Sequence, residues 1–106
     1  MPKYLLEISY AQEGVQALLE KGGTARKTAA TAVVKSVGGK LEAFYFAFGP
    51  VDAYAIADLP DDVSAAALAL TVSASGPVSV NTVSLLTPAD IDAAAEKKVT
   101  YRPPGS

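Results

Sequence analysis

Pairs of helix-breaking residues divide this chain into short segments, and the spacing of its apolar residues changes from one segment to the next. Residues 3–10 alternate apolar and polar side chains, a pattern typical of a strand with one buried face. From residue 11 the apolar residues recur at helical spacing, and Gly-Gly pairs at 22–23 and 38–39 interrupt this pattern. The sequence therefore predicts one strand followed by two helical pieces, the second of which we expect Thr24 to cap.

The middle of the chain has the pattern of a β-hairpin followed by a helix. Strands are predicted over 41–48 and 52–59, joined by Gly49-Pro50-Val51. A helix over about 61–75 follows, with acidic residues in its first turn. We expect its buried stripe to consist of Val63, Ala67, Leu70 and Ala74.

The last third of the chain predicts a strand, a short helix and a tail. The strand covers 78–86, and a capping box formed by Thr87 and Asp90, with Pro88 between them, is expected to start a helix that ends near residue 98. Residues 99–106 are predicted to form an extended tail after a single domain over residues 1–98.

This element order predicts an α+β fold of the ferredoxin-like, split β-α-β-β-α-β type. We expect a four-stranded antiparallel sheet, a first helix broken at Gly22-Gly23 and an additional C-terminal helix. Over 41–48, Phe44, Phe46 and Phe48 alternate with a second set, which consists of Leu41, Ala43, Tyr45 and Ala47. Both sets are largely apolar, whereas a sheet with one wet face alternates apolar with polar residues. We therefore predict that two sheets meet face to face in a homodimer of the dimeric α/β-barrel type or in a larger ring.

Composition excludes several classes of function. The sequence contains no His and no Cys, which removes the usual ligands of zinc, copper and iron–sulfur clusters, the Cys nucleophile and the Ser–His pair. No nucleotide-binding fingerprint is present, so we expect no cofactor and no metal site. The formal net charge of −2 and the absence of a basic stretch argue against a nucleic-acid partner. No apolar run is long enough to span a bilayer, and we expect a cytoplasmic protein without a membrane partner.

Five stretches distributed along the chain together resemble the GYD domain family: Lys3-Tyr4-Leu5-Leu6, Gly22-Gly23-Thr24-Ala25-Arg26, Gly38-Gly39-Lys40-Leu41-Glu42-Ala43-Phe44-Tyr45, Asp58-Leu59-Pro60-Asp61 and Leu85-Leu86-Thr87-Pro88. The resemblance implies a small bacterial protein similar in plan to dimeric α/β barrels, and it implies no particular biochemical activity. The Gly-x-Tyr-Asp signature of the family falls on residues 49–52, where Val51 stands in place of the Tyr.

The start of the second helical piece is a candidate anion site. The Gly22-Gly23 pair precedes two cations at a place where free backbone N–H groups and the helix dipole favour a phosphate or carboxylate. The residues concerned are Gly23, Thr24, Arg26 and Lys27. The spacing is not that of a P-loop, and the alternative is that the Gly-Gly pair only separates two helices.

A second candidate site consists of polar side chains that project from the strands. They are Glu7, Glu42, Tyr45, Tyr54 and Asn81. Carboxylates held in an apolar cavity would have a raised pKa and could act as acid or base. The alternative is that the acids lie at strand ends or between subunits and that the Tyr side chains are part of the core.

Three functions remain open from the sequence. The first is binding of a small anionic or aromatic molecule in a pocket at the sheet, either beneath the helices or at the interface between subunits. The second is a non-catalytic oligomeric module with a structural or regulatory role. The third, by analogy of fold, is a cofactor-free oxygenase or isomerase.

Overall fold

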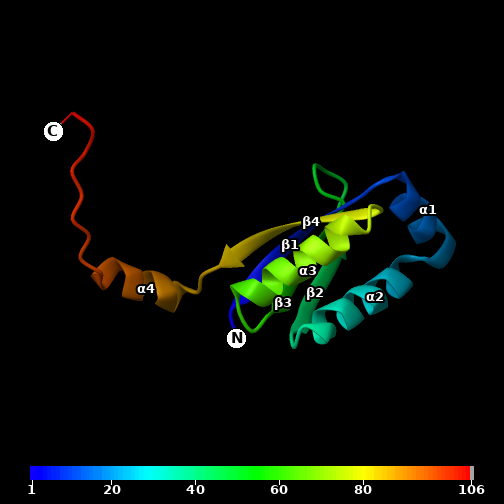
Figure 1. Cartoon of the computed structure of the whole chain (residues 1–106), viewed down its shortest axis with the longest axis horizontal. Helices are drawn as coiled ribbons and strands as arrows, with labels where there is room; N and C mark the ends of the chain where they lie inside the picture. The colour runs from blue at the N-terminus through cyan, green and yellow to red at the C-terminus, as the bar shows by residue number, and fades with distance from the viewer. Residues whose placement is uncertain (106) are drawn as a thin grey trace.

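The computed structural model describes residues 1–105, and its elements follow the predicted order (Figure 1). The elements are β1 (Lys3–Tyr10), α1 (Gln12–Lys21), α2 (Gly23–Ser36), β2 (Lys40–Phe46), β3 (Ala53–Asp58), α3 (Asp62–Ala74), β4 (Val78–Leu85) and α4 (Pro88–Glu96). Ser106, the last residue of the predicted tail, lies outside the described residues. Within this range, no helix has both the length and the apolar character needed to cross a membrane.

The strands form one antiparallel sheet in the order β2-β3-β1-β4. β1 lies in the interior of the sheet and pairs with β3 on one side and with β4 on the other. Because α1 and α2 connect β1 to β2, and α3 connects β3 to β4, the topology is that of the split β-α-β plan. The predicted ferredoxin-like α+β fold is confirmed.

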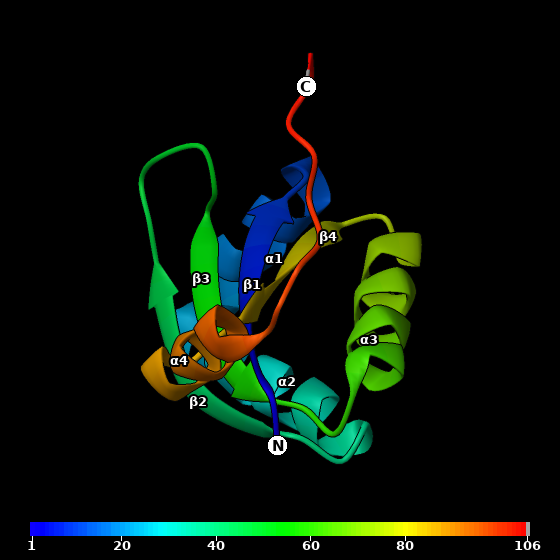
Figure 2. The ribbon, with the colours of Figure 1, turned by 90° about the vertical axis from the view of Figure 1, so that its left-hand side faces the viewer.

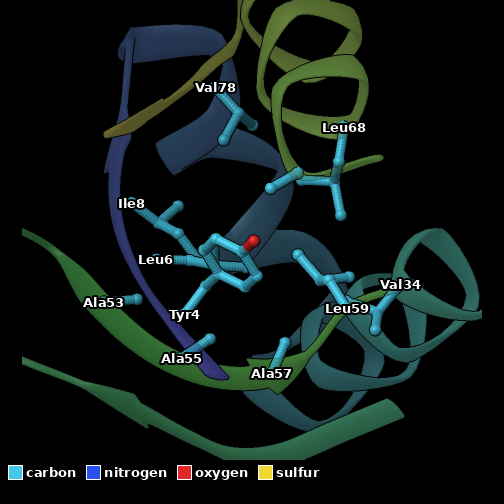
Figure 3. Packing of buried hydrophobic residues seen from close by; sticks show 11 residues of the cluster. Tyr4, Leu6, Ile8, Val34, Ala53, Ala55, Ala57, Leu59, Leu68 and Val78 are labelled. Atoms are coloured by element: carbon cyan, nitrogen blue, oxygen red, sulfur yellow. The ribbon is translucent and has the colours of Figure 1, made fainter. Parts of the chain in front are cut away.

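The hydrophobic core lies between one face of the sheet and the helices α2 and α3 (Figure 3). Every second residue of β1 and β3 points into it, as the two-residue period of a strand requires. These residues are Tyr4, Leu6 and Ile8 on β1 and Ala53, Ala55 and Ala57 on β3. The small Ala side chains of β3 leave room for larger ones above them, among which Leu59 and Val34 are the largest that are fully buried. We call this side of the sheet the covered face and the other side the open face.

A β-bulge in β2 changes which residues of this strand face the core, compared with the prediction. The pairing with β3 shifts between Leu41 and Ala43, because the bulge inserts an extra residue, Glu42, into the strand. Leu41 therefore packs against the core together with Phe44, whereas Ala43 lies on the open face. The prediction that placed Leu41 with Ala43 was wrong for this reason. β2 also ends at Phe46, two residues before the predicted end, so Phe48 lies in the following loop.

The predicted buried stripe of α3 was also wrong. The helix turns Ala65 and Leu68 into the core, whereas Val63 is 79% exposed and Leu70 is 72% exposed. α3 carries apolar residues all around its circumference. Helical spacing alone therefore cannot show whether the stripe with Val63 and Leu70 or the one with Ala65 and Leu68 is buried. Packing against β4 buries the stripe with Ala65 and Leu68, and the stripe with Val63 and Leu70 faces outward.

The helix ends agree with the predictions except at Thr24. The Thr87–Asp90 capping box and Pro88 at the start of α4 are confirmed. The first helix is broken at Gly22, whose φ of 86° ends α1 and starts α2 directly at the next residue. Thr24 therefore lies inside α2, and its side chain does not cap the helix.

The C-terminal part of the chain stands apart from the rest. α4 and the residues after it project away from the sheet and its helices (Figure 1). They extend the long axis of the molecule to 58 Å, against 32 Å and 23 Å for the other two axes. Figure 2 looks along this long axis, so α4 lies in front of the strands there. Every residue from Leu86 to Gly105 is exposed. We call residues 86–105 the C-terminal arm.

Candidate functional site

An apolar groove runs between the helices on the covered face of the sheet. Its narrow part is a cavity of about 30 Å³ between α2, α3 and the strands. The cavity continues into a wider cleft of about 520 Å³ that α1 closes on one side. Arg26, Val72 and Val78 line both parts, so they mark the junction between them. We call the two parts together the interhelical groove.

Small residues on α1 and α2 make the room for this groove. Gly14, Ala17, Ala25 and Ala29 line the cleft and leave space that longer side chains would fill. Gly14 also lets α1 approach the turn before β4, because a Cβ atom on this residue would lie 2.5 Å from the carbonyl oxygen of Pro77. The hydrogen bond from the Ala11 N–H to that same oxygen, 2.9 Å long, holds the start of α1 in place.

Among residues 1–105, Arg26 is the only charged residue that lines the cavity. Its Nε is buried and has no hydrogen-bond partner within residues 1–105, and the same is true of the buried hydroxyl of Tyr10. The guanidinium Cζ lies 5.9 Å from the centroid of the Tyr10 ring, within the range of a cation–π contact. Buried polar groups are normally hydrogen-bonded, so two unsatisfied ones side by side mark this end of the groove as a place for a polar ligand.

The surroundings of Tyr10 keep its hydroxyl neutral. Burial raises the pKa of Tyr10 above its ordinary value, and the neighbouring Arg26 partly offsets this because a cation favours the phenolate. Asp52 raises the pKa further, and its carboxylate accepts the backbone N–H of Tyr10 at 2.8 Å. At neutral pH the groove therefore offers a hydroxyl and a cation to the same ligand group.

The residues predicted as an anion site share the first turn of α2, but they face different surroundings. Arg26 points into the groove, whereas Lys27 is exposed and does not line it. Gly23 lies under the ring of Phe46, because a Cβ atom there would be 2.9 Å from Cε2 of that ring. The backbone oxygen of Thr24 accepts a hydrogen bond from Thr28 within the helix. α2 has no acidic residue in its first turn to compensate the dipole.

The residues predicted as a strand-borne site all lie on the open face, and four of them come together. Glu7 is opposite Tyr54 on one neighbouring strand and opposite Asn81 on the other. The Asn81 amide donates a hydrogen bond of 2.7 Å to the Glu7 carboxylate. Tyr45 is opposite Tyr54 on the next strand, which extends this polar row across the sheet.

Glu42 is separate from that row. It accepts a hydrogen bond of 2.8 Å from the Lys3 ammonium, which also donates one of 2.9 Å to Asp58. Hydrogen bonds to Glu42 and to Asp58 raise the pKa of Lys3, because both carboxylates favour its charged form. Among the described residues, no group of three or more acidic side chains is arranged to hold a metal ion.

Sequence reasoning found Arg26 but missed the groove around it. It assigned Arg26 to a helix terminus, and it gave no role to Tyr10 or to the small residues of α1. The signal in the sequence is weak, since Gly14 and Ala17 become meaningful only when α1 is known to lie beside α2.

The comparisons with known proteins identify the family and add no relative. Searches of curated proteins and of solved structures found no match. The family model of the GYD domain matches residues 4–95, a range that runs from β1 almost to the end of α4 and includes the interhelical groove. Because the match covers most of the sequence, the chain belongs to the GYD domain family.

Proposed function

We propose that the interhelical groove binds a small apolar molecule that carries one anionic group. The observation that carries the proposal is the buried, unsatisfied Nε of Arg26 in a cavity whose other lining residues are all uncharged. Arg26 as a whole is only partly buried, but a buried N–H without an acceptor is costly. A ligand carboxylate would offset that cost by accepting a charge-assisted hydrogen bond.

The dimensions of the groove support a ligand of modest size. Its wide part, at about 520 Å³, lies within the range of roughly 300–1,000 Å³ that is usual for small-molecule sites. The lining residues of the narrow part are mostly Val, Leu, Ile and Ala, which suit an aliphatic or aromatic body. The Tyr10 hydroxyl, held neutral by burial, can donate a second hydrogen bond to the same anionic group.

Decanoate and its neutral analogue decanol provide a direct test. We expect decanoate to bind more tightly than decanol, and we expect Arg26→Ala to weaken decanoate binding about 10- to 100-fold, the range for a lost charge-assisted hydrogen bond. Binding is measured by isothermal titration calorimetry. Amide chemical shifts in α2 and α3 then locate the ligand.

Lys27→Ala is the matched control, because it removes the same charge one residue away without touching the groove. Its decanoate affinity should equal that of the unmodified chain. Equal affinity for decanoate and decanol, or an equal loss in both variants, would contradict a specific role for Arg26.

Self-association is a second proposed function, and the open face favours it. In the described part of the chain, the helices that pack on the sheet lie against the covered face, and the open face carries partly exposed apolar side chains from three strands. They are Leu5, Ile56, Val83 and Leu85. Exposed apolar patches of this kind mark association surfaces in many proteins. Sedimentation velocity over a wide concentration range should reveal a defined oligomer, and a single species of 10.8 kDa at every concentration would contradict the proposal.

A further inference from the structure

The C-terminal arm contains a regular helix, although every residue of the arm within residues 1–105 is exposed. Within residues 1–105 no hydrogen bond joins the arm to the body of the domain, and no residue of α4 is buried. It carries four exposed large apolar side chains, Leu86, Ile91, Val99 and Tyr101. Large apolar side chains stabilise an arm only when they are buried against a surface, because burial of each one contributes about 1.5–3 kcal/mol.

A helix as short as α4 needs a surface to pack on. It has 9 residues, and isolated helices shorter than about 12–15 residues are marginal in water. The capping box and Pro88 strengthen its first turn, but they do not replace the packing of an apolar face. The covering surface must therefore come from outside the body of the same chain or from a rearrangement of the arm.

The start of α4 argues against a return of the arm to its own sheet. Only Leu86 and Thr87 separate β4 from the helix. The Thr87 hydroxyl accepts the Asp90 N–H at 3.1 Å, and the Asp90 carboxylate accepts the Thr87 N–H at 2.9 Å. This reciprocal pair holds the first turn of α4 in place directly after the strand. With so short a connection, the helix continues away from the body of the domain (Figure 1).

The extended part of the arm complements the open face. In residues 97–102, Val99 and Tyr101 alternate with polar residues, and Lys97, Lys98 and Arg102 are the only charged ones. On the open face Glu7 has the neutral Asn81 as its partner, and no cation forms a salt bridge with it within the described part of the chain. A basic, alternating segment can place its apolar side chains on the exposed Val83 and its cations near this carboxylate.

We infer that the C-terminal arm of one copy packs across the open face of a second copy, and that the second copy returns the same contact. The inference rests on the proposed self-association and specifies how it is made. A reciprocal contact of this kind closes around a two-fold axis and leaves no arm unpaired.

Cross-linking between differently labelled copies tests the contact directly. The natural sequence has no cysteine, so Val99→Cys in one copy can be mixed with Val83→Cys in another and oxidised. We expect a disulfide between copies, which requires Cα atoms closer than about 7 Å. Val63→Cys, on the outer side of α3, is the matched control partner and should not cross-link with Val99→Cys. Equal cross-linking to both positions, or none to Val83→Cys, would overturn the inference.

A doubly substituted chain tests whether the contact is made within one molecule. At high dilution, Val83→Cys combined with Val99→Cys should give no internal disulfide. A monomeric, internally bridged product would show that the arm returns to its own sheet, and it would overturn docking between copies.

The affinity of the oligomer gives an independent measurement in the full-length chain. Val99→Ser combined with Tyr101→Ser should raise the dissociation constant about 10-fold or more, because two exposed anchors are lost. Val63→Ser combined with Leu70→Ser removes two residues of similar exposure from α3 and should leave the constant unchanged. An unchanged dimer in the arm variant would overturn the arm contact while self-association stands. A chain that is monomeric at every concentration would overturn both.

Discussion

The two faces of the sheet are built from the same strands, yet they have opposite characters. β3 shows this within six residues: Ala53, Ala55 and Ala57 are almost completely buried, while the alternate residues Tyr54, Ile56 and Asp58 lie on the open face. Small side chains on one face admit the helices, whereas aromatic and charged side chains on the other face remain available to a partner.

This difference separates the residues that stabilise the fold from those available for the proposed association. The covered face holds all the fully buried large side chains, and it also contains the groove with Arg26. The open face carries ion pairs, a polar row and a group of neighbouring, partly exposed apolar residues on β1, β3 and β4. Changes on the covered face should therefore lower the free energy of unfolding, and changes on the open face should act mainly on association.

The largest expected effect is that of Leu59→Ala. Leu59 is 0% exposed, and truncating a buried Leu typically costs about 2–5 kcal/mol, because the removed methyl groups leave a cavity. Leu70→Ala makes the same chemical change on the outer side of α3 and should cost less than about 0.5 kcal/mol. Urea denaturation of the two variants measures the difference, and similar losses would mean that burial does not separate the two positions.

A smaller loss is expected from Gly39→Ala, just before β2. A Cβ atom there would lie 2.6 Å from the Asp58 carbonyl oxygen and equally close to Leu59 Cδ2, so backbone or core must move, at a cost of about 1–3 kcal/mol. Gly49→Ala is the control in the loop after β2, where an added Cβ meets no atom within 4 Å. Denaturation midpoints should fall for the first variant alone, and an unchanged midpoint for Gly39→Ala would contradict close packing at this edge.

The parts of this fold that sequence reasoning predicted are those set by local chemistry. Strand alternation over residues 3–10, the break at Gly22 and the capping box at Thr87 each depend on residues within a few positions of one another. Agreement among such local signals gave the element order, and the element order gave the topology.

The parts that it missed depend on contacts between distant segments. The bulge at Glu42 becomes visible only in the pairing of β2 with β3. The buried stripe of α3 is chosen by β4, because the helix is apolar on all sides. The groove around Arg26 likewise requires three helices to be placed relative to one another. The predicted residues Glu7, Tyr45, Tyr54 and Asn81 do gather on one face, and ligand binding by them stays a prediction.

The covered face should also show a dependence on alkaline pH. The Tyr4 hydroxyl donates a hydrogen bond to Asp62, and this bond, with burial and the nearby carboxylate charges, raises the pKa of Tyr4 from 10.0 to about 12. Because the folded state holds the proton more tightly, the resulting stabilisation is present below pH 10 and is lost as the pH rises through 12.

Tyr4→Phe tests this dependence by removing the titrating hydroxyl. The variant should be less stable than the unmodified chain at pH 8, and its stability should fall less between pH 10 and 12. Tyr45→Phe is the control, because the Tyr45 side chain is 72% exposed and donates no hydrogen bond within residues 1–105 whose loss could destabilise the chain at pH 8. Parallel stability curves for Tyr4→Phe and the unmodified chain would contradict the assigned pKa.

The smallest expected effect on folding comes from the open face itself. Lys3→Gln removes both ion pairs at once, yet the Lys3 and Glu42 side chains are almost half exposed, and water and salt screen pairs of this kind. At concentrations where the chain is monomeric, we expect the urea midpoint of Lys3→Gln to be nearly that of the unmodified chain. Added salt should change neither midpoint appreciably. If Lys3→Gln lowered the free energy of unfolding as much as Gly39→Ala does, the ion pairs would hold β1, β2 and β3 together. The open face would then contribute to the fold as the covered face does, and the division of roles between the two faces would fail.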